Sequence, residues 1–148
     1  MNFVCLSIFT LAEAFMMGMV TAFYKTNIVV LAVLITAVVC IGITIFSFQT
    51  KIDFTVYSGV MFVAVLILMV MGIVLMFVKI PILHVIYASL GALIFCIYLI
   101  IDTQSIIGGT HKNQISPEEY IFGAISLYTD IIQIFMFILQ ILNYANND

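Results

Sequence analysis

Long hydrophobic stretches separated by short polar breaks make up almost the whole of this chain. A helix that crosses a bilayer needs about 20 mostly apolar residues. Five stretches reach that length, at residues 3–23, 28–48, 54–78, 82–107 and 120–142. The pattern therefore predicts five transmembrane helices.

The breaks between these stretches are short and polar. The longest runs from Gly108 to Pro117, and a glycine at its start favours the end of a helix. Connections this tight place successive helices side by side and antiparallel. We therefore expect an all-α, up-and-down transmembrane helical bundle that forms one domain over residues 1–148. Each break contains one lysine, so each membrane face receives two. An excess of positive charge marks the cytoplasmic side of a membrane protein, and its absence here leaves the orientation undetermined.

Composition supports a membrane location for the whole chain. Of the 148 residues, 66% are hydrophobic and 7% are charged, whereas a soluble domain has about 25% charged residues. The lipid bilayer is therefore the expected surrounding. The four basic residues form no cluster, so we expect no nucleic acid partner.

The cysteines and the missing catalytic patterns point away from an enzyme. Cys5, Cys40 and Cys96 lie inside hydrophobic stretches, where a cysteine is more often a small buried hydrophobe than part of a disulfide or a metal site. The sequence contains no metal-ligand spacing, no nucleophile–base pair and no glycine-rich phosphate loop. We therefore expect no catalytic residues, no bound metal and no cofactor.

The acidic residues divide into those at helix ends and those inside the predicted spans. Ser116 and Glu119 form an S-x-x-E capping box around a proline, which predicts the start of the last helix. Glu13, Asp102 and Asp130 lie inside spans, where a charge costs about 2.5–3.5 kcal/mol. Such acids face the bundle interior or a water path, or they join helices as neutral hydrogen-bonding groups.

Helical spacing places Asp130 on a polar stripe. At 3.6 residues per turn, one side of the last span collects Glu119, Gly123, Ser126, Asp130, Gln133 and Gln140, while the opposite side is rich in isoleucine. The stripe is expected to face inward. Ser126 and Gln133, together with Glu13, are secondary candidates for an ion pathway.

The preceding span has a comparable face, which ends at Asp102. Its members are His84, Ala88, Gly91, Phe95, Tyr98 and Asp102. The two spans form a hairpin, so both acids can turn toward a common interior, although their depths differ by about 7 Å at a rise of 1.5 Å per residue. If they meet, both carboxyl groups cannot easily ionise together. Such a pair shares a proton and acts as a pH-responsive latch.

A sequence motif then suggests a family. Residues 97–135 read IYLIIDTQSIIGGTHKNQISPEEYIFGAISLYTDIIQIF, and YASLGAL (87–93) and FSFQTKIDFT (46–55) lie upstream. These segments resemble the transmembrane BAX-inhibitor-motif family, and most closely its Lifeguard branch. The resemblance extends over essentially the whole chain. Members of that branch begin with a proline- and glycine-rich tail and two further spans, so this sequence corresponds to the family from its third span onward.

The resemblance implies a function as well as a fold. Family members have seven helices and are linked to calcium leak from intracellular stores and to suppression of cell death. Their last two core spans carry aspartates that share a proton, and the matching positions here are Asp102 and Asp130. A basic residue expected near that pair from the family's second span has no counterpart in this sequence. The implied location is the endoplasmic reticulum or Golgi membrane, with the plasma membrane and endolysosome as further compartments.

Three functions from different classes are compatible with these residues. The first is a pH-sensitive cation leak channel, for Ca²⁺, in which Asp102 and Asp130 form the proton-sensitive gate. The second is a non-conducting regulator that acts through membrane proteins of the cell-death machinery. The third is an exchanger that couples H⁺ to another ion through the same acids. We expect the chain to act as a monomer in each case.

Overall fold

The structure is a computed structural model that describes residues 2–107 and 120–146. Its regular elements, in chain order, are α1 (Asn2–Thr21), α2 (Thr26–Gln49), η1 (Phe54–Tyr57), α3 (Ser58–Leu75), α4 (Pro81–Ile107) and α5 (Tyr120–Asn146), where η1 is a short 3₁₀ helix. Within the described ranges there is no strand, and five helices are long and apolar enough to cross a membrane. The predicted all-α membrane bundle is confirmed.

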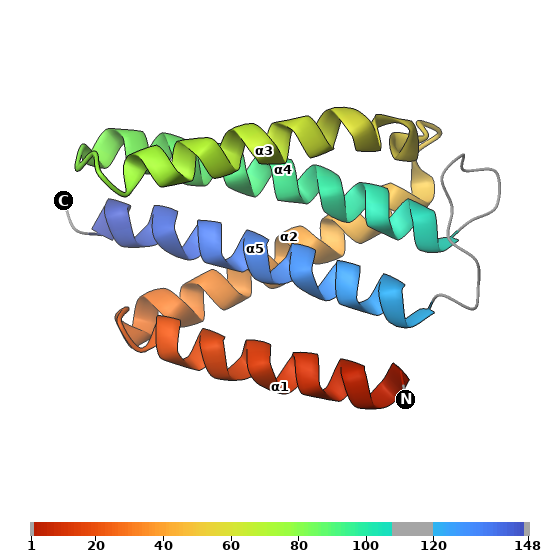
Figure 1. Ribbon diagram of the computed structural model, residues 1–148, viewed down its shortest axis with the longest axis horizontal. Helices are drawn as coiled ribbons and strands as arrows, with labels where there is room; N and C mark the ends of the chain where they lie inside the picture. The colour runs from red at the N-terminus through yellow and green to blue at the C-terminus, as the bar shows by residue number, and fades with distance from the viewer. Residues whose placement is uncertain (1, 108–119, 147–148) are drawn as a thin grey trace.

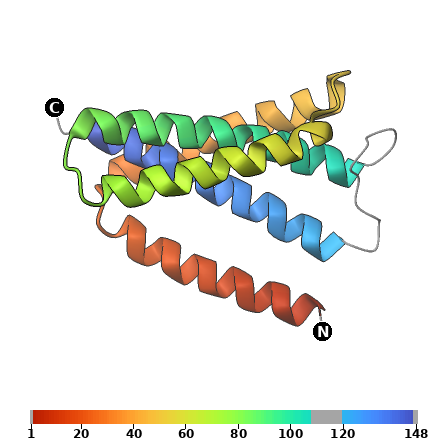
Figure 2. The same cartoon turned by 45° about the horizontal axis from the view of Figure 1, so that its top comes forward.

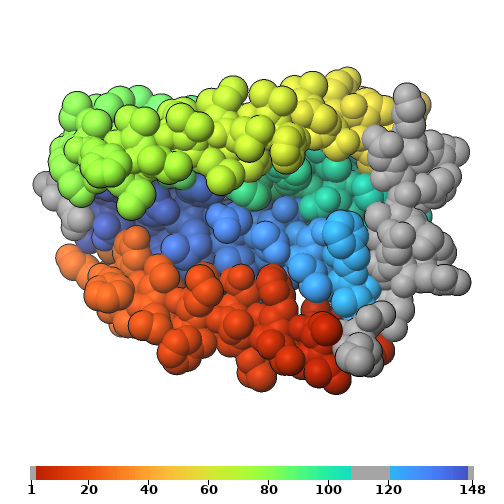
Figure 3. Space-filling view, viewed as in Figure 1, coloured from red at the N-terminus to blue at the C-terminus, as the bar shows by residue number. Residues whose placement is uncertain are grey.

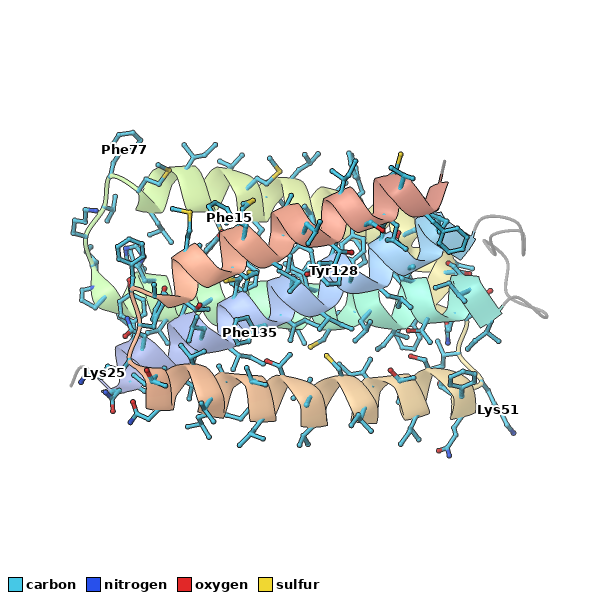
Figure 4. All side chains as sticks on the ribbon, turned by 90° about the horizontal axis from the view of Figure 1, so that it is seen from below. Phe15, Lys25, Lys51, Phe77, Tyr128 and Phe135 are labelled. Atoms are coloured by element: carbon cyan, nitrogen blue, oxygen red, sulfur yellow. The ribbon has the colours of Figure 1, made fainter. Side chains whose placement is uncertain are left out.

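Successive helices run up and down through the bundle (Figure 1). The α1–α2 and α3–α4 connections lie at one end together with the C-terminus, and the α2–α3 connection lies at the other end with the N-terminus. Figure 4 shows Lys25 and Lys51 at opposite ends of α2, as expected for loops on opposite membrane faces.

Several helix boundaries differ from the predicted spans, and the third span ends at Leu75 rather than at residue 78. The third span begins as the η1 turn, because the Asp53 carboxylate accepts a hydrogen bond from the Thr55 backbone N–H at 3.2 Å. Helix α5 continues to Asn146, beyond the predicted end at residue 142. Hydropathy defines the apolar part of a helix, whereas hydrogen bonding decides where the helix starts and stops.

The centre of the bundle is the antiparallel pair α4–α5. Leu68 of α3, Ala88 of α4 and Phe137 of α5 form one buried cluster, and Phe137 is only 5% exposed. Gly91 makes this approach feasible, because a Cβ there would lie 2.5 Å from the Phe137 ring. Small residues let transmembrane helices approach closely. The predicted inward face of α4 is therefore confirmed.

Helix α2 packs on the other side of α5. Ile28 and Ala32 of α2 surround Leu139, which has no exposed surface. Helix α1, by contrast, lies at the edge of the bundle, where it runs alongside α5 (Figure 2). Large apolar side chains such as Leu11 and Phe15 project from it and are about 70% exposed. Helix α1 is thus the helix least integrated into the protein core.

A buried glutamine fastens the α2–α3 connection to α4. The Gln104 side chain has no exposed surface. Its Nε2 donates to the Ile52 carbonyl at 2.9 Å, and its Oε1 accepts from the Phe54 N–H at 2.7 Å. One side-chain amide thereby satisfies two backbone groups that water would otherwise have to reach.

Candidate functional site

Asp102 of α4 and Asp130 of α5 lie against each other in the bundle. Asp130 is only 4% exposed and Asp102 is partly buried. Their side chains are close enough for a hydrogen bond between the carboxyl groups. The second oxygen of Asp130, Oδ2, is buried and has no hydrogen-bond partner. The two acids therefore form a buried, incompletely satisfied pair.

The register of the α4–α5 hairpin explains why the acids meet. His84 stacks on Tyr144 with ring centroids 5.6 Å apart, and Gly91 receives Phe137 seven residues further along α4 and seven back along α5. Another step of seven places Tyr98 opposite Asp130. Asp102 is one turn beyond Tyr98, on the same face. Asp102 thus lies about one turn from the level of Asp130, close to the depth difference estimated from the span ends, and the two side chains reach across it.

Two further side chains surround the pair. Tyr98 is close enough to interact electrostatically with both Asp102 and Asp130. Cys40 of α2 lies close enough to interact electrostatically with Asp130. Cys96 of α4 lies close enough to interact electrostatically with Cys40. The acids, between α4 and α5, thus also lie near α2.

No lysine or arginine lies inside a span, and His84 of α4 lies near the end of its helix, where its Nε2 is 3.1 Å from the Val78 carbonyl. The four basic residues are Lys25, Lys51, Lys79 and Lys112, and each falls in a break between hydrophobic stretches. Among residues 2–107 and 120–146, no three His, Cys, Asp or Glu side chains gather as metal ligands would. The charge of an ionised Asp102 or Asp130 therefore has no lysine or arginine partner within the spans.

The secondary candidates are divided between two places. Glu13 and Gln133 line the same cavity, of about 280 Å³, between α1, α4 and α5. Ser126 is partly buried on α5, one turn before Asp130. The proposed helix cap formed by Ser116 and Glu119 lies outside the described residues. The structure thus groups two acids at the centre and a third acid with an amide beside α1.

A second, larger cavity opens between α1, α2 and α5. Its volume is about 610 Å³, and its lining is almost entirely apolar. Tyr128 and Phe135 of α5 lie between α1 and α2 in Figure 4, and both line this space. Thr36 also lines it, and its buried hydroxyl oxygen has no hydrogen-bond partner. Hydropathy gave no sign of this cavity, because residues that line an apolar cleft resemble residues that face lipid.

Sequence reasoning also missed Gln104 and the role of Tyr98 beside the acids. Gln104 occurs in the DTQ segment that contains Asp102, so a polar residue near the end of a span was a visible signal. Its partners, Ile52 and Phe54, are about fifty positions away in the sequence. Only the fold brings them together.

Comparison with known proteins agrees with this architecture. A family model described as "Inhibitor of apoptosis-promoting Bax1" matches residues 1–147. Human protein lifeguard 3 is 47% identical over 149 residues, which cover 98% of this chain and 48% of the relative. Mouse protein lifeguard 4 is 37% identical over 146 residues, which cover 99% of this chain and 59% of the relative.

The chain thus spans about half the length of the relatives that it matches. The predicted resemblance to the Lifeguard branch is confirmed by the coverage of nearly the whole chain. An all-helical bundle, five membrane-length helices and a family match over residues 1–147 lead to one conclusion. The chain belongs to the BAX-inhibitor family of multi-pass membrane proteins, among its Lifeguard members.

Proposed function

We propose that the chain forms a cation leak pathway, for Ca²⁺, in which the Asp102–Asp130 pair is a proton-sensitive gate. The observation that supports this proposal is the pair itself: two carboxyl groups in contact inside the bundle, in a chain whose spans contain no lysine or arginine. Intramembrane acids without a basic partner are typical of ion and proton pathways.

The pair couples protonation to helix packing. Two carboxyl groups in contact and away from water do not both ionise readily, so they hold a proton between them. Loss of that proton leaves two negative charges side by side at the α4–α5 contact. The repulsion is relieved by separation of the helices, by hydration, or by a cation between the carboxylates. Each of these changes alters a path through the bundle.

The chemistry of the pair favours a hard cation. Two carboxylates offer up to four oxygens, and Ca²⁺ takes oxygen ligands from carboxylates, carbonyls and water. The cation also supplies the positive charge that the spans lack. We place this activity in endomembranes, in the endoplasmic reticulum or Golgi, with the chain as a monomer. Its connection with cell-death proteins would then act through the Ca²⁺ level of those compartments.

The test is Ca²⁺ flux into liposomes that contain the purified full chain, measured across a series of pH values. We expect a flux that changes with pH, and we expect Asp102→Asn and Asp130→Asn each to remove the pH dependence, because neither single carboxyl can share a proton with an amide. Asp53→Asn is the matched control, since that acid lies in the α2–α3 connection, and it should leave the pH dependence intact.

Each alternative function has its own outcome in this assay. A pH dependence that survives both single substitutions contradicts the gate. Complete absence of flux contradicts conduction and favours the regulator that acts through cell-death proteins. Flux that requires an imposed pH gradient favours the proton-coupled exchanger.

A further inference from the structure

A second group of polar side chains lies inside the membrane region, apart from the aspartate pair. Glu13 of α1 and Gln133 and Gln140 of α5 line the cavity of about 280 Å³, whose remaining walls are mainly methionine and aromatic side chains. Figure 3 shows α1 and α5 lying along each other on this face of the molecule, below α3. Glu13 is the only acid in α1.

The packing of α1 on α5 fixes the depth of this cavity. Helices α1 and α5 run in the same direction (Figure 1), and the Phe9 ring meets the Tyr128 ring edge-on at 5.8 Å. Glu13 is four residues after Phe9, and Gln133 is five after Tyr128, so the two lie at nearly the same depth. Gln140 is about two turns further along α5, toward the end of the bundle where the α1–α2 and α3–α4 connections, which contain Lys25 and Lys79, lie (Figure 1).

These residues form a row of polar groups that extends from one membrane face to the depth of the Asp102–Asp130 pair. Asp130 is about one turn of α5 before Gln133, on the side of the stripe that turns into the bundle. Polar groups therefore follow α5 from Gln140 through Gln133 and Glu13 to the vicinity of Asp130. The cavity reaches the first part of this route, and Asp130 is not among the residues that line it.

The charge of Glu13 needs water or a cation. An ionised acid within a bilayer is costly, and no span contains a lysine or arginine to offset its charge. The cavity has room for several water molecules, since one water occupies about 30 Å³ in the liquid. Glu13 and the two amides offer up to four side-chain oxygens, which are the ligand type that hard cations prefer.

The apolar cavity on the other side of α1 supplies a contrast. It is lined by residues such as Val33 and Ile131, and it has more than twice the volume. It contains no charged side chain, so nothing there attracts cations as the Glu13 carboxylate does. The difference that matters between the two cavities is the polarity of their linings and not their volume.

We propose that the cavity lined by Glu13, Gln133 and Gln140 is a hydrated vestibule that collects cations from the membrane face bearing Lys25 and Lys79. Glu13 supplies the attracting charge. Lys25 and Lys79 are exposed, so salt screens their repulsion more strongly than it screens the attraction of a half-buried acid. This proposal deepens the conduction proposal, on which it rests, but it is tested on the cavity itself and without measuring flux.

The test uses thiol-reactive probes on the full chain in lipid nanodiscs, where both membrane faces are accessible. Cys5, Cys40 and Cys96 are replaced by alanine, and Gln140→Cys or Gln133→Cys is introduced. A cationic and an anionic methanethiosulfonate reagent are then compared. We expect the cationic reagent to react about tenfold faster at these positions, relative to its rate at an exposed Asn27→Cys, because a charged recess concentrates counter-ions.

Two substitutions of Glu13, one that removes its charge and one that keeps it, test whether Glu13 causes the preference for the cationic reagent. Glu13→Gln should abolish the preference for the cationic reagent, and Glu13→Asp should retain it. Val33→Cys, in the apolar cavity, should react with neither reagent. The vestibule is excluded if positions 133 and 140 resist both reagents while Asn27→Cys reacts, or if the preference survives Glu13→Gln. A vestibule that passes this test while Ca²⁺ flux fails would refute conduction alone.

Discussion

Helix α1 and the α4–α5 pair have similar apolar sequences but very different surroundings. About 28% of the most apolar part of α4, and of α5, is buried inside the protein, whereas none of the corresponding part of α1 is. The α4–α5 pair is held by the Phe137 ring packed on Gly91, by the stacked rings of His84 and Tyr144, and by Asp102 and Asp130. Helix α1 contacts α5 through a narrow line of residues with a cavity on either side.

The contrast shows what holds helices together in a bilayer. Lipid tails are as apolar as leucine, so hydrophobicity alone gives helices no reason to associate. Close packing and polar contacts supply the attraction instead. The residues that mark the α4–α5 contact are accordingly small, aromatic or polar, whereas Phe15 and Leu11 of α1 are exposed. The length of a hydrophobic stretch predicts that a helix crosses the membrane. The small, aromatic and polar residues within it predict which helix it packs against.

The largest effect should come from Phe137→Ala, which removes the ring at the centre of the α4–α5 contact. Phe137 is 5% exposed and packs against Tyr87 and Phe95 with ring centroids 5.6 and 5.9 Å away. Loss of such a buried ring costs about 3–5 kcal/mol of unfolding free energy. Denaturation in mixed micelles would measure it.

Phe15→Ala is the matched control for that substitution. Phe15 lies on α1 and is 70% exposed, so its removal should change the unfolding free energy by less than about 0.5 kcal/mol. Equal losses for the two phenylalanines would show that α1 is as firmly packed as the central pair, and the contrast between the two regions would disappear.

A smaller effect is expected from Gly91→Ala. The new Cβ would lie 2.5 Å from the Phe137 ring, so the helices must move apart, and overpacking of this kind costs about 1–3 kcal/mol. Gly18→Ala on α1 should be neutral or slightly stabilising, because nothing lies within 4 Å of its Cβ position and alanine is the better helix former. Destabilisation by both substitutions would contradict the assignment of α1 as loosely packed.

The sequence predicted the spans, their antiparallel order and the inward face of α4, because length and helical period determine these features locally. It also brought Asp102 and Asp130 to one hairpin, although only the structure shows that their side chains come together. The looseness of α1 could not be predicted, because a lipid-facing surface and a packed apolar surface use the same residues.

Two other features depend on tertiary contacts that periodicity does not encode. The Gln104 amide reaches a connection about fifty residues earlier. Glu13 and Gln133 were each identified as polar, yet nothing in the sequence indicated that α1 would place them on one cavity. Both features arise where helices distant in sequence are brought together.

The smallest expected effect concerns the aromatic contact that holds α1 against α5. The edge-to-face pair Phe9–Tyr128 should contribute about 0.5–1.5 kcal/mol beyond its buried area. A double-mutant cycle with Phe9→Ala and Tyr128→Ala isolates that coupling from the unfolding free energies of the four proteins. A spin label at Phe15→Cys, in a chain whose native cysteines are replaced by alanine, provides a local readout, and it should become more mobile when either ring is removed. Zero coupling energy together with unchanged mobility of the spin label would mean that these rings do not hold α1 against α5. The contact that sets Glu13 at the depth of Gln133 would then be contradicted.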